Sequence, residues 1–289
     1  SRTIHFPGLN GLRFMAALAV VVVHLELFKD LAGLPSLIGH PVVGALGSMG
    51  VDLFFVLSGF LITYLLLQEK VQTGSIALLK FYQRRILRIW PVYYLVVTVA
   101  FLVMPHFGFL PFTQSVLEHF NVKAALYLAI LPNVALALYP NINFASLTWS
   151  VGVEEQFYIV WPLLIKWAVD HKRVMLYFIA VFVGLKFLLL LSVLLSIDFP
   201  HFNVVKDFVV MTRIECMAIG GLAALLLSNP QWTIGRLLLR RELQVVVLVV
   251  LIPLTYLIDR SAVEDLRHLI YALLFAVLIL NTAAVRNPI

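Results

Sequence analysis

The sequence predicts an all-α fold, a polytopic bundle of transmembrane helices. Charged residues make up only 12% of the 289 residues, about half of the ~25% that is usual for a soluble domain. Hydrophobic residues make up 62%, and the mean hydropathy is +1.00. They gather in stretches of about 20 residues, the length that crosses a hydrocarbon core about 30 Å thick. So few charges cannot cover the surface of a soluble domain of this size, which excludes a disordered chain and an ordinary cytosolic enzyme.

Eight apolar stretches are long enough to be predicted as spans. In chain order they are residues 11–28, 43–67, 90–106, 146–168, 174–196, 208–228, 243–258 and 266–284. A ninth stretch, 124–138, has about 15 residues and contains Pro132 and Asn133, which favours a re-entrant segment over a full crossing. No linker or appended soluble domain interrupts the pattern, so residues 1–289 are predicted to form a single integral-membrane domain.

The basic residues predict the orientation of the spans. With the N-terminus in the cytoplasm and 124–138 not crossing, 14 of the 21 Lys and Arg residues lie on the inner side and five on the outer side. Only Lys186 and Arg213 then fall inside spans. The net charge of +6 therefore reflects membrane topology, and no nucleic-acid partner is predicted.

Arg13 and His24 are ionisable residues of the first span, where a charge is expensive and points to function. They are 11 residues apart, which is three helical turns plus about 20°, so both lie on one face, about 16 Å apart along the axis. A guanidinium is a good phosphate ligand, and an imidazole is the usual general base near neutral pH. The alternative is that Arg13 reaches lipid headgroups and His24 bonds a neighbouring helix.

The second span places Asp52 well inside GVDLFFVLSGFLIT, where a lone carboxylate must be paired or protonated. It can orient the imidazole of His24 or pair with Arg213, and a purely structural ion pair is equally compatible. Ser58 and Gly59 favour close helix packing over nucleophilic attack, because no GxSxG motif surrounds the serine. Arg213, near the predicted outer end of its own span, either balances a carboxylate or binds an anionic acceptor.

The segment FYQRRILRIWP, just before the third span, contains Arg84, Arg85 and Arg88. Spacings of three and four residues place these guanidiniums on one side of a helix at the cytoplasmic interface. They are predicted to hold a polyphosphate, because arginine binds phosphate oxygens with charge-assisted hydrogen bonds. Anchoring to anionic lipid is the alternative.

The segment SLTWSVGVEEQFYIVWP places two adjacent glutamates, Glu154 and Glu155, among aromatic and apolar residues. Adjacent helical residues point about 100° apart, so one carboxylate is expected to face a cavity and the other a partner helix. The residues predicted to stack on or hydrogen-bond a sugar are Trp149, Gln156 and Tyr158.

Four blocks in this order resemble the acyltransferase family 3 of integral-membrane proteins, which includes O-antigen and peptidoglycan O-acetyltransferases. They are GLRFMAALAVVVVH, GVDLFFVLSGFLIT, FYQRRILRIWP and SLTWSVGVEEQFYIVWP, with TRIECMAIGGLAALL as a weaker fifth, and they cover residues 8–227. The resemblance implies a bundle of about ten helices that transfers an acyl group, usually acetyl, from cytoplasmic acyl-coenzyme A to an outward-facing hydroxyl, commonly on a sugar. The family usually ends in a further span with a pattern like SYxxYLxH, so the domain is predicted to be incomplete at its C-terminus.

Together these features predict a membrane O-acyltransferase with acetyl-coenzyme A as co-substrate. The predicted acceptor is an extracytoplasmic or lipid-linked saccharide of the cell envelope, and the predicted location is a bacterial plasma membrane with the N-terminus in the cytoplasm. No metal is predicted, because one cysteine and the spacing of the histidines provide no zinc site.

The predicted roles follow from the chemistry of each side chain. His24 is the general base or, alternatively, the carrier of a covalent acyl group. Asp52 or Glu154 orients the imidazole, and Glu155 is the remaining candidate carboxylate. The residues predicted to hold the donor phosphates are Arg13, Arg84, Arg85 and Arg88, and those predicted at the acceptor are Trp149, Gln156, Tyr158 and Arg213.

The main alternative is a transporter or flippase for a sugar or lipid intermediate. Intramembrane charges and a broken segment at 124–138 also fit that class. However, transporters of this kind usually contain two halves of similar sequence, and no such internal repeat is seen here. A purely structural membrane subunit explains neither the Arg13–His24 pattern nor the arginine cluster.

Overall fold

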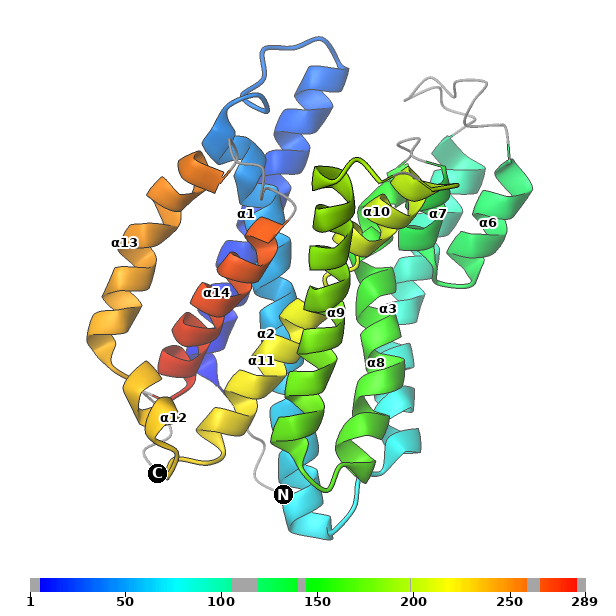
Figure 1. Cartoon of the computed structure of the whole chain (residues 1–289). Coiled ribbons are helices and arrows are strands. Elements are labelled where there is room, and N and C mark those ends of the chain that lie inside the picture. Colours follow the sequence, from blue (N-terminus) through cyan, green and yellow to red (C-terminus); the bar gives the residue numbers. More distant parts are fainter. Residues whose placement is uncertain (1–5, 105–118, 140–143, 198, 259–265, 285–289) are drawn as a thin grey trace. The chain divides into compact units, whose positions relative to one another are not determined.

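The computed structural model describes residues 6–104, 119–139, 144–197, 199–258 and 266–284, and within these ranges every regular element is a helix (Figure 1). The all-α prediction is therefore confirmed. The helices are α1 (Pro7–Leu31), α2 (Pro41–Thr73), α3 (Leu78–Thr98), α6 (Phe120–Leu128), α7 (Pro132–Leu138), α8 (Trp149–Trp167), α9 (His171–Leu194), α10 (Phe202–Met211), α11 (Ile214–Leu227), α12 (Thr233–Leu238), α13 (Arg241–Ile258) and α14 (Arg267–Ala284). A π-helical turn, Val99–Val103, extends α3, and a 3₁₀ turn, Phe144–Thr148, leads into α8.

Six helical stretches of the described chain are long and apolar enough to cross a membrane. They are Gly8–Leu31, Pro41–Thr73, Leu78–Val103, His171–Leu194, Phe202–Leu227 and Arg267–Ala284. Two further predicted spans do form helices: α8, which carries Glu154, Glu155 and Lys166, and α13, in which Glu242–Leu251 is an apolar stretch shorter than a span. The predicted count of eight or nine is therefore only approximate.

Two spans differ from their predicted boundaries. The third span begins at Leu78 rather than near residue 90, so the arginine cluster, predicted on a helix just before the span, lies within the same continuous helix α3. Hydropathy detects only the apolar half of such a helix, whereas backbone hydrogen bonding continues through its amphipathic start. The stretch Phe202–Leu227 is interrupted at Thr212 and Arg213, between α10 and α11. Arg213 therefore lies at a break within its span rather than near one end.

The chain divides into two compact units, and each unit draws on separate parts of the sequence. Unit 1 contains residues 1–69, 168–183 and 215–289, and unit 2 contains residues 70–167 and 184–214. In unit 1, α14 contacts α1, α12 and α13. In unit 2, α7 contacts α6, α8 and α10, while α3 contacts α6 and α8.

Glycines allow α2 and α11 to cross at very short range within unit 1. A Cβ atom on Gly59 would overlap the backbone carbonyl of Met217, and a Cβ atom on Gly220 would overlap the carbonyl of Val56. Small residues permit this approach because only a hydrogen stands between the two backbones. Gly59 thus serves close packing, as its sequence context predicts.

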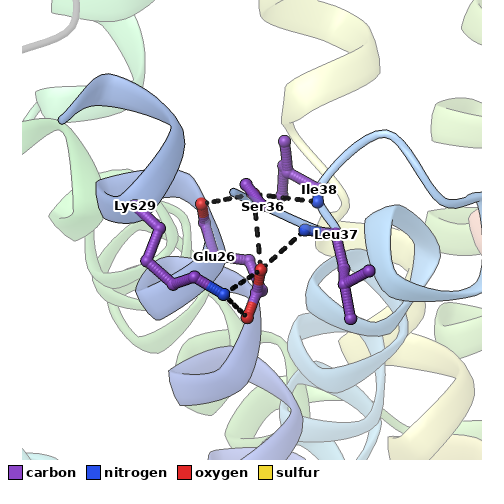
Figure 2. A network of polar contacts seen from close by, with 5 residues as sticks. All are labelled: Glu26, Lys29, Ser36, Leu37 and Ile38. Atoms are coloured by element: carbon purple, nitrogen blue, oxygen red, sulfur yellow. Dashed lines mark hydrogen bonds and ion pairs between the residues drawn. The ribbon is translucent and has the colours of Figure 1, made fainter. Parts of the chain in front are cut away.

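A polar network fixes the chain that leaves α1 (Figure 2). The Glu26 carboxylate accepts hydrogen bonds from the Lys29 ammonium at 2.9 and 3.0 Å and from the Leu37 backbone N–H at 2.7 Å. The Ser36 hydroxyl donates to the Glu26 carbonyl at 2.8 Å and accepts from the Ile38 N–H at 3.1 Å. The connection between α1 and α2 is therefore held against the last turns of α1.

The segment predicted to be re-entrant forms a helical hairpin, α6 and α7, in unit 2 (Figure 1). Its nine-residue and seven-residue helices are about 14 and 11 Å long, too short to cross a core of about 30 Å. The rings of His119, before α6, and Tyr139, after α7, stack with centroids 4.8 Å apart. Both ends of the hairpin therefore meet, which is the geometry of a segment that enters and leaves on one side.

Two tyrosines of α3 donate hydrogen bonds to the last residues of α6. The Tyr93 hydroxyl donates to the Tyr127 carbonyl at 2.7 Å, and the Tyr94 hydroxyl donates to the Leu128 carbonyl at 3.0 Å. The last carbonyls of a helix have no partner within the helix and are costly to leave unpaired away from water. These bonds allow the hairpin to turn back inside unit 2.

Candidate functional site

The predicted site residues fall into two groups, one in each unit. Unit 1 contains Arg13, His24 and Asp52, and unit 2 contains Arg84, Arg85, Arg88, Trp149, Glu154, Glu155, Gln156, Tyr158 and Arg213. Each group is built by its own helices and has its own contacts.

The imidazole of His24 is oriented by its own helix. Its Nδ1 lies 2.7 Å from the carbonyl oxygen of Val20, one turn earlier in α1. A carbonyl only accepts, so Nδ1 carries a proton, and Nε2 is the ring nitrogen left to accept one. The Val20 carbonyl therefore holds this ring from within its own helix, a contact that the sequence analysis did not include. A backbone acceptor of this kind leaves no signal in the sequence.

The other two residues of the first group differ in exposure. Helix α1 is continuous from Pro7 to Leu31, so Arg13 and His24 are three turns apart on one helix, as predicted. The Arg13 guanidinium is partly exposed and donates to the Asn10 side-chain oxygen at 3.3 Å. Asp52 is fully buried in the middle of α2.

The three arginines of α3 are not equivalent. Arg84 and Arg88, one turn apart, are exposed and make no hydrogen bond or ion pair with any described residue. Arg85 is partly buried, and its guanidinium lies 5.5 Å from the ring centroids of both Phe81 and Tyr158. Arg84 and Arg88 are therefore accessible to an anionic ligand, whereas Arg85 joins α3 to α8.

The adjacent glutamates of α8 have different partners, as their helical spacing predicts. Glu154 accepts a hydrogen bond at 2.9 Å from the hydroxyl of Tyr158, whose ring lies against Arg85. Glu155 is buried, and its Oε2 accepts from the Trp90 indole N–H at 3.1 Å. Its Oε1 is also buried and has no hydrogen-bond partner among the described residues.

Gln156 holds α8 against the hairpin. Its side-chain amide and that of Asn133 exchange two hydrogen bonds, of 3.0 and 3.2 Å. One turn earlier, Gly152 faces the Pro132 ring and the Asn133 oxygen, and a Cβ there would lie 2.7 and 2.9 Å from them. This geometry fits a packing role for Gln156 better than the predicted contact with a sugar. The sequence marked Asn133 only as an irregularity in an apolar stretch.

Arg213 and Trp149 meet within unit 2. The Arg213 guanidinium lies 5.5 Å from the Trp149 ring centroid, a cation–π distance. Arg213 follows α10, which packs against α7 of the hairpin. Two of the four residues predicted at the acceptor are therefore in contact, whereas Tyr158 is buried between Arg85 and Glu154.

Sequence reasoning missed a buried pair in unit 1. The imidazole Nε2 of His268, on α14, lies 3.1 Å from a carboxylate oxygen of Glu215, on α11, and the two side chains are 2% and 0% exposed. The Cys216 thiol donates to the His268 carbonyl at 3.7 Å. No local spacing predicts a pair 53 residues apart. Among the described residues, no group of three or more His, Cys, Asp and Glu side chains is arranged to hold a metal ion.

Comparison with known proteins places these residues in a family. Residues 6–288 match the family described as an acyltransferase domain. A provisionally named O-acetyltransferase from Staphylococcus aureus (strain COL) is 33% identical over 230 residues, which are 77% of this chain and 35% of the relative. The O-acetyltransferase OatA from Staphylococcus aureus (strain NCTC 8325) is 33% identical over 167 residues, 56% of this chain and 25% of the relative. The chain thus spans about a third or less of these relatives, and no solved structure matches it.

Proposed function

The chain belongs to the acyltransferase family, whose match covers residues 6–288, and from this premise we propose that it is a membrane O-acyltransferase. It transfers an acyl group, with acetyl as the first candidate, from acyl-coenzyme A to a hydroxyl of a saccharide or lipid-linked saccharide. The names of the aligned relatives support O-acetyl transfer, and six membrane-length helices support a multi-pass protein. We place it in a bacterial plasma membrane with the N-terminus in the cytoplasm, following the positive-inside pattern.

The donor end of this proposal rests on Arg84 and Arg88. Two exposed guanidiniums one helical turn apart fit the phosphate groups of coenzyme A, because each offers several charge-assisted donors in a planar fork. Arg85 contributes charge nearby while it packs on Tyr158. Arg13 is assigned to the same donor by its place near the predicted cytoplasmic end of α1.

The chemical step rests on one observation, the hydrogen bond from His24 Nδ1 to the Val20 carbonyl. It leaves Nε2 as the basic nitrogen, which takes the proton of the acceptor hydroxyl. The hydroxyl oxygen then forms a bond to the thioester carbonyl carbon, the carbon–sulfur bond breaks, and the proton passes to the leaving sulfur. Transient transfer of the acyl group to Nε2 is the covalent variant of this step.

A direct assay tests the proposal and separates it from the transporter alternative. Purified protein in lipid nanodiscs is given acetyl-coenzyme A and an N-acetylglucosamine oligosaccharide, and both free thiol and acetyl ester are measured. Thiol release and ester formation that depend on the oligosaccharide support an acyltransferase. Absence of both, together with absence of acetyl-coenzyme A binding, contradicts it and favours the transporter class, to which the hairpin and the break at Arg213 also conform.

A further inference from the structure

Lys80 extends the exposed arginines of α3 into a row of three cations. Lys80, Arg84 and Arg88 are each exposed, and none of them makes a hydrogen bond or ion pair with a described residue. They follow one another at intervals of four residues, so the row advances about 6 Å at each step and stays within about 80° around the helix axis. Arg85 is not part of this row, because its guanidinium packs on the ring of Tyr158.

Such a row is unfavourable for the helix by itself. Like charges four residues apart repel one another, and Lys80 stands in the first turn of α3, where the helix dipole is already positive. That turn contains no acidic residue, and no side chain caps it. The carboxylates of the neighbouring α8, Glu154 and Glu155, interact with the charge of Arg85. The row of cations therefore fits an anionic ligand from outside the helix.

The start of α3 is fixed to α8, so the row extends from a rigid backbone. The Lys166 ammonium donates to the carbonyl of Ile76, just before α3, at 3.0 Å. The Tyr82 hydroxyl donates to the carbonyl of Ile159 at 2.9 Å. All of these residues belong to unit 2. The spacing of the cations is thus set before a ligand arrives, which lowers the entropic cost of binding.

The phosphates of coenzyme A occur in a fixed order. The diphosphate adjoins the pantetheine arm, and the 3′-phosphate lies on the ribose, farther from the thioester. Helix α3 continues into its apolar part after Arg88, whereas Lys80 lies about two turns earlier, at the helix start. In the proposed reaction the thioester points into the membrane, toward an outward-facing hydroxyl. The diphosphate then lies at Arg84 and Arg88, and the 3′-phosphate lies at Lys80.

We propose that Lys80 binds the 3′-phosphate of the acyl-coenzyme A donor and makes the site selective for coenzyme A over thioesters that lack this phosphate. A lysine ammonium is a compact charge that binds phosphate well, and the positive end of the helix dipole adds to its attraction. This inference rests on the proposed acyl transfer and adds the direction in which the donor lies along α3.

The test is calorimetry on the protein in phosphatidylcholine nanodiscs, with coenzyme A and with 3′-dephospho-coenzyme A, which lacks only that phosphate. Wild-type protein should bind the dephospho form about 10-fold more weakly, the lower end of the range for a hydrogen bond to a charged group, because the site is exposed. Lys80→Ala should weaken coenzyme A binding by the same factor and should bind both ligands equally. Lys80→Arg should keep the preference for coenzyme A.

Two variants of the same helix are the controls. Arg84→Ala should weaken both ligands alike and keep the wild-type ratio, because both contain the diphosphate. Gln83→Ala should match the wild-type protein, because Gln83 is exposed and uncharged. The substituted side chains are all exposed, so each variant should unfold at the wild-type temperature.

Equal affinity of the wild-type protein for the two ligands would overturn the inference. A Lys80→Ala protein that still prefers coenzyme A would overturn it as well. If Arg84→Ala abolishes the preference instead, the 3′-phosphate lies at Arg84 and the assignment to Lys80 is wrong. If wild-type protein binds neither ligand, the proposed function fails together with this inference, whereas equal binding of both ligands leaves the proposed function intact.

Discussion

The imidazole of His24 donates from Nδ1 to the carbonyl of Val20 at 2.7 Å, within the same helix. The partner is a backbone carbonyl one turn earlier, so the ring is oriented from within its own helix. Nε2 is therefore the nitrogen that can accept a proton while Nδ1 stays anchored.

His24→Gln should lower acyl transfer by about 10²- to 10⁴-fold, the usual loss for a positioned acid–base group. Glutamine retains a hydrogen bond but cannot take the proton, so binding of acetyl-coenzyme A should be nearly intact. His40→Gln is the control, because His40 is exposed in the connection between α1 and α2. If the His24→Gln protein keeps most of its transfer activity, a carboxylate rather than His24 takes the proton of the acceptor hydroxyl.

Arg84→Ala and Arg88→Ala should each weaken acetyl-coenzyme A binding. Loss of a charge-assisted hydrogen bond to phosphate costs about 1.5–3 kcal/mol, or roughly 10- to 150-fold in affinity. Calorimetry on the purified protein measures this effect, and Arg173→Ala is the control, because that exposed arginine already pairs with Asp170. Unchanged affinity in both α3 variants would indicate that the arginine cluster binds anionic lipid rather than coenzyme A.

The hairpin should be accessible from one side of the membrane only. In a Cys216→Ala background, single cysteines at Asn121 and Leu138, both exposed near the hairpin ends, should react with an impermeant thiol reagent from the outer side. A cysteine at Val71, 82% exposed in the last turn of α2, should react from the inner side. Labelling of Asn121 and Leu138 from opposite sides would show that the segment crosses and would invert the topology that follows it.

Breaking the Glu215–His268 pair should destabilise the protein strongly. His268→Ala leaves a buried carboxylate without its imidazole, which typically costs about 3–5 kcal/mol. The double variant Glu215→Leu/His268→Leu removes both polar groups and should be closer to wild type in thermal unfolding. A single variant as stable as wild type would show that the pair is energetically unimportant.

Gly152→Ala should also lower the unfolding temperature. The added methyl group would lie 2.7 Å from the Pro132 ring and 2.9 Å from the Asn133 oxygen, and overpacking of this kind costs about 1–3 kcal/mol. Gly184→Ala is the matched control, because its Cβ meets nothing within 4 Å and alanine favours helix. Equal unfolding temperatures for the two variants would mean that α7 moves aside without any loss of stability.

Local patterns in the sequence predicted much of the fold. Apolar stretches predicted the helices, and the Arg13–His24 spacing predicted their common helix, because both depend on neighbours within a few turns. The shortness and Pro132 of the ninth stretch predicted a re-entrant segment, which the stacked ends of the hairpin match. The start of the third span was placed too late because the first turns of α3 are amphipathic and hydropathy does not register them.

The sequence by itself determined the helical membrane fold, the inequality of Glu154 and Glu155, and the residue types available for acyl transfer. Only the tertiary structure decided which groups are paired. Trp90 reaches Glu155 across 65 residues of chain, Asn133 reaches Gln156 across 23, and His268 reaches Glu215 across 53. Hydrogen bonds over such separations depend on which helix faces meet, and that is set by packing of whole helices rather than by any local spacing.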